Sequence, residues 1–401
     1  MAAAPSPALT PPPGNPRFPL LDAMRALAAI AIVLTHTAGA SGFNVDNALG
    51  AYTARLNMGV TLFFLLSGFL LYRPFVAARL EGRPPVRIRD YTRRRVLRIV
   101  PAYWVALTAL ALWPGLPGFW DGPWWRSYSF AQIYWLDSTV QGIFPAWTLC
   151  IEISFYLALP FIAVAVGRIA GRRWKVELGV LFLLAAASLA LRSALQADGG
   201  FFVLQNTLAT YLDWFVYGMV LAVLSVVAHR AHARPAPLRV IERRPWVPWL
   251  LAAAAFWFVA TQLDLPRGFF LVYTNINYLG EHLGYAAVAV LLLLPAIFGT
   301  AGGGWPRRLL ASRVLGWLGL ISYGIFLYHG PLVVWLKKRE ADEWIPGSGY
   351  LSMAVVALAM AIACATLSYY LVERPALRFK DAPFGSSSLR RRSAARASAG
   401  A

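Results

Sequence analysis

Residues 20–41 read LLDAMRALAAIAIVLTHTAGAS and form the first of about ten long apolar stretches in the sequence. A helix needs roughly 20 predominantly apolar residues to cross a bilayer, and lipid offers no water to satisfy any other backbone conformation. The other stretches lie near residues 57–77, 97–114, 146–167, 175–195, 205–228, 246–262, 279–299, 313–336 and 349–372. The pattern predicts an all-α, polytopic transmembrane helical bundle of about ten spans.

The composition supports the same fold class. Of 401 residues, 59% are hydrophobic and only 14% are charged, which leaves too little polar surface to cover a soluble globule. The lipid bilayer is therefore the expected partner of most of the chain. The two cysteines, Cys150 and Cys364, both fall within predicted spans and give no disulfide framework.

The distribution of positive charge predicts the orientation, because Lys and Arg in short loops remain in the cytoplasm. If the N-terminus is cytoplasmic, the segments on the cytoplasmic side of the membrane hold 28 of the 37 Lys and Arg residues, and the segments on the opposite side hold seven. The remaining two, Arg25 and Arg73, lie inside span ends. We therefore expect an even number of spans in the cytoplasmic membrane, with both termini inside. The net charge of +19 then lies on one membrane face, where it meets anionic lipid, and nucleic acid is not an expected partner.

Three regions follow from these patterns. Residues 1–19 contain seven prolines and are expected to be a disordered cytoplasmic tail, residues 20–375 form the transmembrane domain, and residues 376–401 form a second, basic disordered tail. No cleavable signal precedes the first span, so that span is expected to be retained. The longest loop, about residues 115–145, is rich in tryptophan, as expected of a segment that lies along the membrane interface.

Ionisable side chains within spans are the first candidates for function, because each costs a few kcal/mol or more in lipid. In the first span Arg25 and His36 are eleven residues apart, which places them on nearly one helix face and about 16 Å apart along the axis. A snorkelling arginine and a hydrogen-bonded core histidine remain the alternative.

Three further spans are expected to bring ionisable groups to the depth of His36, namely Glu152, Asp213 and His329. A histidine beside a carboxylate is a typical general base near neutral pH, and a purely structural polar network is the alternative. The sequence has no metal-ligand spacing, so no metal is expected.

An arginine cluster at the start of the third span consists of Arg93, Arg94, Arg95 and Arg98. Such side chains bind phosphate groups well, although the positive-inside rule alone also explains them. Ser67 in the second span has the chemistry of a nucleophile, but a Ser-Gly pair more often permits close packing of helices.

The sequence resembles the acyltransferase-3 family of bacterial membrane O-acyltransferases, which modify sugars, surface polysaccharides and some macrolide antibiotics. The resemblance covers about residues 18–380. Its motifs, in chain order, are LDAMRALAAIAIVLTH, FFLLSGFLL, RRRVLRIVPAYW, WTLCIEISFYLALP, ISYGIFLYHGPL and LVERP, which ends at Pro375.

The resemblance implies roles for these residues. Arg25 and His36 become the functional pair with His36 as the catalytic base, and the arginine cluster becomes the site for the phosphates of an acyl-CoA donor, most simply acetyl-CoA. A carboxylate such as Glu152 is expected to orient His36. His329, Ser322 and Tyr323 are candidates to stabilise the oxyanion, and Asp213, Ser322 and Tyr323 to contact substrate. An acyl-histidine intermediate stays open.

The expected reaction is acyl transfer to a hydroxyl of a sugar, a polysaccharide or a glycosylated metabolite. Family members often carry an SGNH hydrolase-like domain after the last span, and this sequence ends before one, so a separate SGNH-like partner stays open. Two alternative functions remain: a transporter, and a translocator that passes acyl groups to a separate transferase.

Overall fold

The computed structural model describes residues 18–197, 202–230, 236–268, 274–298, 303–346 and 348–381. Within these ranges the chain is helical and has no strand. Nine helical stretches there are long and apolar enough to cross a membrane. The predicted class, a polytopic helical bundle, is confirmed.

The long helices are connected mostly by short turns and single-turn helices. Their bounds are α1 (Leu20–Ala40), α4 (Gly59–Glu81), α5 (Ile88–Leu110), α7 (Trp147–Ala170), α8 (Trp174–Ala197), α10 (Leu208–Arg230), α12 (Trp246–Thr261), α13 (Asn275–Ile297), α15 (Arg313–Lys337) and α16 (Gly349–Ser368). The short helices are α2 (Phe43–Asp46), α3 (Gly50–Ala54), η2 (Arg55–Met58), η3 (Ala111–Gly115), α6 (Trp125–Tyr128), η4 (Gln132–Tyr134), η5 (Phe144–Ala146), α9 (Phe202–Gln205), α11 (Ala236–Arg243), α14 (Gly304–Leu310), η6 (Ala341–Glu343), η7 (Tyr369–Glu373), α17 (Arg374–Leu377) and η8 (Arg378–Asp381).

The predicted seventh span is the shortest of the ten. Helix α12 has 16 residues, which at 1.5 Å per residue is about 24 Å, against a hydrocarbon core of about 30 Å. Pro245 stands at its N-cap, and the helix ends at Thr261 because the polar residues from Gln262 onward follow. The described chain thus has nine long spanning helices and one short apolar helix, which together correspond to the ten predicted stretches.

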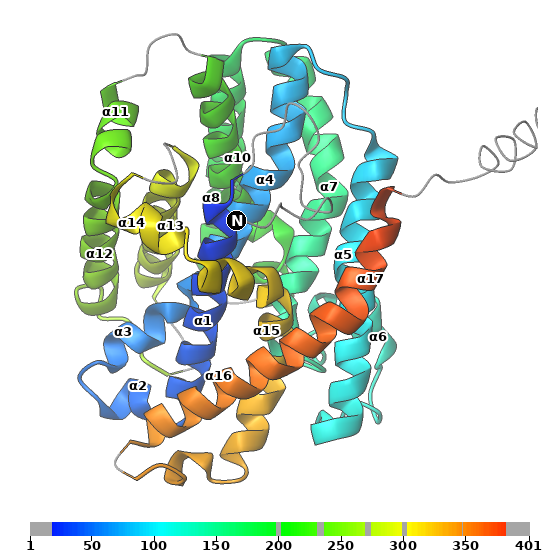
Figure 1. Ribbon diagram of the computed structural model, residues 1–401, viewed down its shortest axis with the longest axis vertical. Helices are drawn as coiled ribbons and strands as arrows, with labels where there is room; N and C mark the ends of the chain where they lie inside the picture. The colour runs from blue at the N-terminus through cyan, green and yellow to red at the C-terminus, as the bar shows by residue number, and fades with distance from the viewer. Residues whose placement is uncertain are drawn as a thin grey trace, which may run out of the picture.

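Helix α1 lies in the middle of the bundle and contacts α4, α15 and α16 (Figure 1). Helix α4 packs along α10, and α12 packs along α13 toward one side. Helix α16 crosses α1 and α15 obliquely and continues through η7 and α17 toward α5 (Figure 1). Side chains from α1, α4, α5, α7 and α15 therefore converge on one region of the interior.

Two glycines allow α4 and α10 to approach closely. A Cβ atom built at Gly68 would lie 2.0 Å from the carbonyl oxygen of Phe215, and one at Gly218 would lie 2.0 Å from that of Leu65. No real side chain fits at such distances, so both positions require glycine. The Ser67-Gly68 pair thus has the packing role that a small pair usually has in membrane helices.

The two ends of the bundle carry different loops. We call the end with the α4–α5 connection, the α7–α8 turn and α11 the arginine-rich end; it lies at the top of Figure 1. The opposite end carries α2, α3, η6 and the tryptophan-rich segment 116–146, which folds into the short helices α6, η4 and η5.

The predicted tails fall mostly outside the described residues. The first helix begins at Leu20, as expected. At the other end the chain stays helical through α17 and η8 to Asp381, so the helical part extends past the predicted boundary at residue 376. The reason is local: Pro375 occupies the start of α17, a position where proline suits a helix.

Candidate active site

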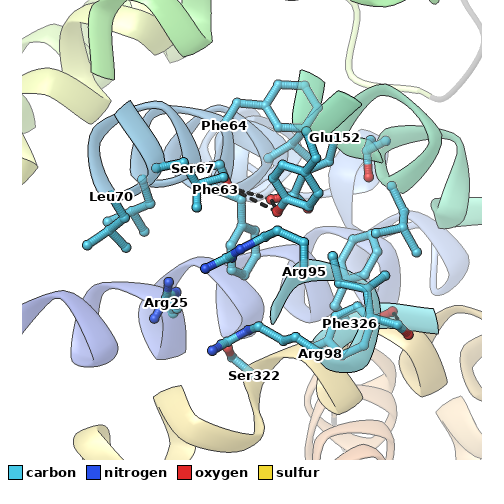
Figure 2. Close-up of a pocket in the computed structure, with 18 residues that line it drawn as sticks. Arg25, Phe63, Phe64, Ser67, Leu70, Arg95, Arg98, Glu152, Ser322 and Phe326 are labelled. Carbon is cyan, nitrogen blue, oxygen red and sulfur yellow. Dashed lines mark hydrogen bonds between the residues drawn. The ribbon is translucent and has the colours of Figure 1, made fainter. Parts of the chain in front are cut away.

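A cavity lies where α1, α4, α5, α7 and α15 converge, and it holds about 780 Å³ of space including its mouth (Figure 2). Its apolar wall comes largely from Phe63, Phe64 and Phe326. Its polar side chains come from all five helices and are Arg25, Ser67, Arg95, Arg98, Thr148, Glu152, Tyr156, Ser322 and Tyr323. We call it the arginine cavity.

The arginine cavity contains more positive than negative charge. Arg95 and Arg98 extend from α5 into its centre, and Arg25 faces them from α1 (Figure 2). Arg25 also pairs with Asp22 at 2.8 Å, but that carboxylate lies outside the wall and is 49% exposed. Among the residues that the structure describes, Glu152 is the single carboxylate that lines the cavity. Three guanidinium groups against one carboxylate within a membrane domain give the cavity the charge that suits an anion.

Glu152 is held by two hydroxyl groups rather than by an arginine. The hydroxyls of Ser67 and Tyr156 both donate to its Oε1 (Figure 2). The guanidinium of Arg95 lies over the ring of Tyr156, 5.7 Å from its centroid. Tyr156 follows Glu152 by four residues, which places both on one face of α7. This spacing can be read from the sequence and is the signal for their contact.

His36 and His329 lie beside each other, from α1 and α15. His36 Nδ1 and His329 Nε2 are 2.8 Å apart, and the two rings are within 12° of parallel. On its other side His329 Nδ1 lies 2.7 Å from the carbonyl oxygen of Phe326. His329 is buried, whereas His36 is partly exposed.

These contacts fix the tautomers of both neutral rings. A carbonyl oxygen only accepts, so His329 Nδ1 must carry the proton that it donates to Phe326. His329 Nε2 is then an acceptor, His36 Nδ1 donates to it, and the lone pair of His36 resides on Nε2. In this tautomer His36 Nε2 is the nitrogen that can accept a proton, as a base does.

Aromatic rings separate the histidine pair from the arginine cavity. The ring of Phe326, which lines the cavity, lies 5.8 Å from the His329 ring and 6.3 Å from the ring of Phe63. Phe144 in η5 contacts His36 edge-on at 5.0 Å. Because α1 carries both groups, His36 stands about 16 Å from Arg25 toward the opposite end of the bundle.

The expected orientation of His36 by a carboxylate needs correction. Glu152 lines the arginine cavity and accepts from Ser67 and Tyr156, whereas the ring that faces His36 Nδ1 belongs to His329. Counting residues along α7 does not show whether Glu152 lies at the level of Arg25 or at the level of His36, which are both on α1.

Ser322 and Tyr323, two of the three expected oxyanion donors from α15, line the cavity but already donate elsewhere. Ser322 Oγ donates to the carbonyl of Gly319 at 2.8 Å, and the Tyr323 hydroxyl donates to that of Ile99 at 3.1 Å. Within the arginine cluster, Arg95 and Arg98 line the cavity and Arg93 donates to the carbonyl of Phe379. Arg94 lies on the exposed face of α5, outside the cavity wall.

Asp213 lies apart from both sites. Its Oδ2 is 2.8 Å from Nε2 of His282 in α13, and both side chains are buried. The His282 ring stacks on Trp214 with centroids 4.2 Å apart. His282 was overlooked in the sequence, although an ionisable residue within a predicted span was the available signal. Among the described residues no three His, Cys, Asp or Glu side chains are grouped closely enough to hold a metal ion.

Comparison with known proteins identifies the class. The model of the acyltransferase-3 family, described as an acyltransferase domain, matches residues 18–370. The chain therefore belongs to this family and is a multi-pass membrane protein of the acyltransferase class, as the sequence motifs predicted.

Particular relatives match at low identity. The chain is 24% identical over 379 residues to the putative peptidoglycan O-acetyltransferase YrhL of Bacillus subtilis, covering 89% of this chain and 54% of the relative. It is 24% identical over 385 residues to the peptidoglycan O-acetyltransferase OatA of Listeria monocytogenes, covering 89% and 55%. The chain spans about half the length of these relatives. No solved structure matches it.

Proposed function

We propose that the protein transfers an acyl group, most simply acetyl, from acyl-CoA to a hydroxyl of a sugar, a surface polysaccharide or a glycosylated metabolite. One observation carries the proposal: a single helix, α1, presents Arg25 to an arginine-lined cavity and His36 to a histidine pair about 16 Å further along. A donor with a phosphate-bearing end and a long, thin, reactive arm fits this separation.

The arginine cavity suits the phosphates of the donor. Arg95 and Arg98 offer planar, permanently charged groups that bind phosphate oxygens in a bidentate manner, and Arg25 faces them. The cluster was expected as a donor site from sequence, and the geometry supports the Arg95–Arg98 half of it. The pantetheine arm would extend past Arg25 toward His36, which requires the rings of Phe63 and Phe326 to move apart.

The histidine pair suits the chemical step. His36 Nε2 takes the proton of the acceptor hydroxyl while the hydroxyl oxygen attacks the thioester carbonyl, and His329 Nε2 accepts the hydrogen bond from His36 Nδ1–H and so stabilises the imidazolium that forms on His36. Collapse of the tetrahedral intermediate breaks the carbon–sulfur bond, and the proton passes from His36 to the departing thiolate. The products are the ester and free CoA.

The relatives support a glycan acceptor, since YrhL and OatA are both named as peptidoglycan O-acetyltransferases, YrhL as a putative one. We place the protein in the cytoplasmic membrane with the arginine-rich end and both termini inside, as the charge distribution predicts. The acceptor hydroxyl would then reach His36 from the opposite side, where His36 is partly exposed. A separate SGNH-like partner remains part of the proposal for transfer to larger acceptors.

The direct test uses membranes containing the full chain, radiolabelled acetyl-CoA and a set of sugar acceptors. Wild type should form labelled ester, and His36→Ala should lower its rate by about 10²–10⁴-fold, the usual contribution of a general base. Equal rates in both proteins would reject the role of His36. Consumption of donor without any acylated acceptor would favour the acyl-group translocator.

A further inference from the structure

A carboxylate is buried near the end of the spanning stretch Gly349–Lys380, in a segment to which the proposed mechanism gives no role. Of the five residues of η7, all of which the structure describes, Glu373 alone is buried, with 4% of its surface exposed. Its neighbours Tyr370 and Leu371 are exposed on the outside of the bundle. An ionisable side chain inside a spanning segment is costly without a partner, so Glu373 is a candidate functional residue.

The backbone at Glu373 departs from the α-helix for a reason that is visible in the motif LVERP. Pro375 has no N–H, and in a regular helix its ring clashes with the carbonyl group four residues earlier. The helix instead contains a π-turn here, in which the N–H of Arg374 bonds to the carbonyl of Tyr369, five residues back. Single π-turns within helices often occur at functional sites. The motif therefore encodes both the turn and the carboxylate that it carries.

The packing of α5 places Glu373 at the level of Arg98. Helix α5 runs beside this segment in the opposite direction and packs against η7, α17 and η8 (Figure 1). Arg93 of α5 donates to the carbonyl of Phe379 in η8, which fixes the register between the two segments. From Arg93 to Arg98 the chain advances about 8 Å, and from Phe379 back to Glu373 it covers about 9 Å. The two side chains therefore lie at one depth in the bundle.

The charge environment connects the same two residues. Arg98 is the cation whose charge acts on the Glu373 carboxylate, and it extends from α5 into the arginine cavity (Figure 2). Oε1 of Glu373 is buried and has no hydrogen-bond partner in the part of the chain that the structure describes. No hydrogen bond there accounts for this carboxylate oxygen, so the nearby positive charge of Arg98 is what stabilises it in the membrane.

We propose that Glu373 is a positioning residue of the donor site, whose charge holds the guanidinium of Arg98 at the wall of the arginine cavity. The inference rests on the proposed function, because it takes the phosphates of acyl-CoA as the group that Arg98 meets. A long cationic side chain within a membrane otherwise extends toward the nearest water. Without the carboxylate, the guanidinium of Arg98 shifts toward the arginine-rich end and away from the donor.

The kinetic test compares variants that remove the charge with one that keeps it, in membranes containing the full chain. Glu373→Gln should raise the KM for acetyl-CoA about fivefold or more at nearly unchanged kcat, because the donor site changes and the histidine pair does not. Glu373→Asp keeps the charge and should change KM less than about twofold. Asp90→Asn is the matched control, because it removes the same charge from an exposed position on α5 outside the cavity and should leave both constants unchanged.

A double-mutant cycle on thermal stability tests the coupling itself and requires neither donor nor turnover. Melting in detergent is measured for Glu373→Gln, Arg98→Gln and the double variant. Each single variant leaves one charge without its partner, so the double variant should melt about 2 °C or more above the sum of the single losses. The control cycle uses Arg95→Gln, since Arg95 lines the same cavity, and there the losses should add.

Additive losses in the Arg98 cycle, or equal coupling in the Arg95 cycle, would overturn the proposal. An unchanged or lowered KM for acetyl-CoA in Glu373→Gln would do the same, as would equal impairment of Glu373→Asp and Glu373→Gln. Absence of acyl transfer in wild type would count against the proposed function, whereas the melting cycle would still decide whether Glu373 acts on Arg98.

Discussion

At the scale of single residues, the account depends on the hydrogen bonds that connect His36 to the backbone of α15. His329 stands between them: it donates to Phe326 and accepts from His36. A neutral imidazole of this kind can orient His36 by accepting a hydrogen bond from its Nδ1–H. No buried carboxylate is required for this. We therefore propose that His329 is a positioning residue for His36.

Substitution of His329 tests this role. The amide oxygen of Gln can occupy roughly the position of His329 Nε2 and accept from His36, whereas Leu cannot accept. We expect kcat to fall about tenfold in His329→Gln and about 100-fold or more in His329→Leu, with the KM for acetyl-CoA unchanged in both. Equal losses in the two variants, or a raised donor KM, would show that His329 acts in another way.

Two neighbouring arginines allow a matched test of the donor site. Arg95 lines the arginine cavity and Arg94 lies outside it on the exposed face of α5. Arg95→Gln should raise the KM for acetyl-CoA at least tenfold, since a charge-assisted contact to phosphate is lost, while Arg94→Gln should change it less than twofold. Similar effects of the two substitutions would indicate that the cluster serves orientation in the membrane rather than donor binding.

The sequence predicted which ionisable residues lie inside the bundle better than it predicted which side chains they contact. Helical periodicity placed Arg25 and His36 on one face of a span, and the direction of each span brought His329 to the depth of His36. Counting residues from a span end does not resolve a few ångströms of depth or the rotation of a helix, so Glu152 and Asp213 were expected beside His36. Tyr156 meets Glu152 within α7, whereas the contacts of Ser67 with Glu152 and of His282 with Asp213 depend on packing of α4 with α7 and of α10 with α13.

At the scale of helices, the interface of α4 with α10 holds one side of the cavity in place, because α4 carries Ser67, Phe63 and Phe64 of its wall. Gly68 and Gly218 bring the two backbones close, and Phe64 and Phe155 stack on Phe215 at 4.5 and 4.1 Å beside them. The sequence indicated a small-residue contact at Ser67-Gly68 but gave no sign that α10 was the partner, since pairing of spans is a tertiary property.

A glycine substitution tests this interface. A methyl group at Gly218 would overlap Leu65, so Gly218→Ala should cost about 1–3 kcal/mol and lower the melting temperature. Gly179→Ala in α8 is the control, because nothing lies within 4 Å of its added Cβ and alanine favours a helix. Thermal melting in detergent should show destabilisation in the first variant only. A melting temperature of Gly218→Ala equal to that of wild type would contradict the close contact.

At the scale of the whole molecule, apolar length and composition predicted the bundle, and the positions of nine long spans followed the apolar stretches. The short α12 coincides with the predicted stretch 246–262, which is the shortest of the ten. The family motifs then indicated the chemistry, whereas the separation of an arginine cavity from a histidine pair required the three-dimensional structure. On the proposed function, that separation would make the reaction directional, with the donor at the arginine-rich end and the acceptor toward the other.

The orientation of the chain is measured first in sealed proteoliposomes. Arg87 lies exposed in the α4–α5 connection at the arginine-rich end, and Glu343 lies exposed in η6 at the other. Arg87→Cys and Glu343→Cys should react with a membrane-impermeant thiol reagent from opposite sides. Labelling above the wild-type background then reports which end faces outward.

The central claim is that acyl transfer runs from the arginine-rich end to His36, and a sided transfer assay tests it most directly. Radiolabelled acetyl-CoA is supplied to one side of vesicles of known orientation that contain wild type or His36→Ala, with sugar acceptors on both sides. The account predicts labelled ester in wild type only when donor is on the Arg87 side, and almost none in His36→Ala. Efficient transfer from donor on the Glu343 side would contradict it.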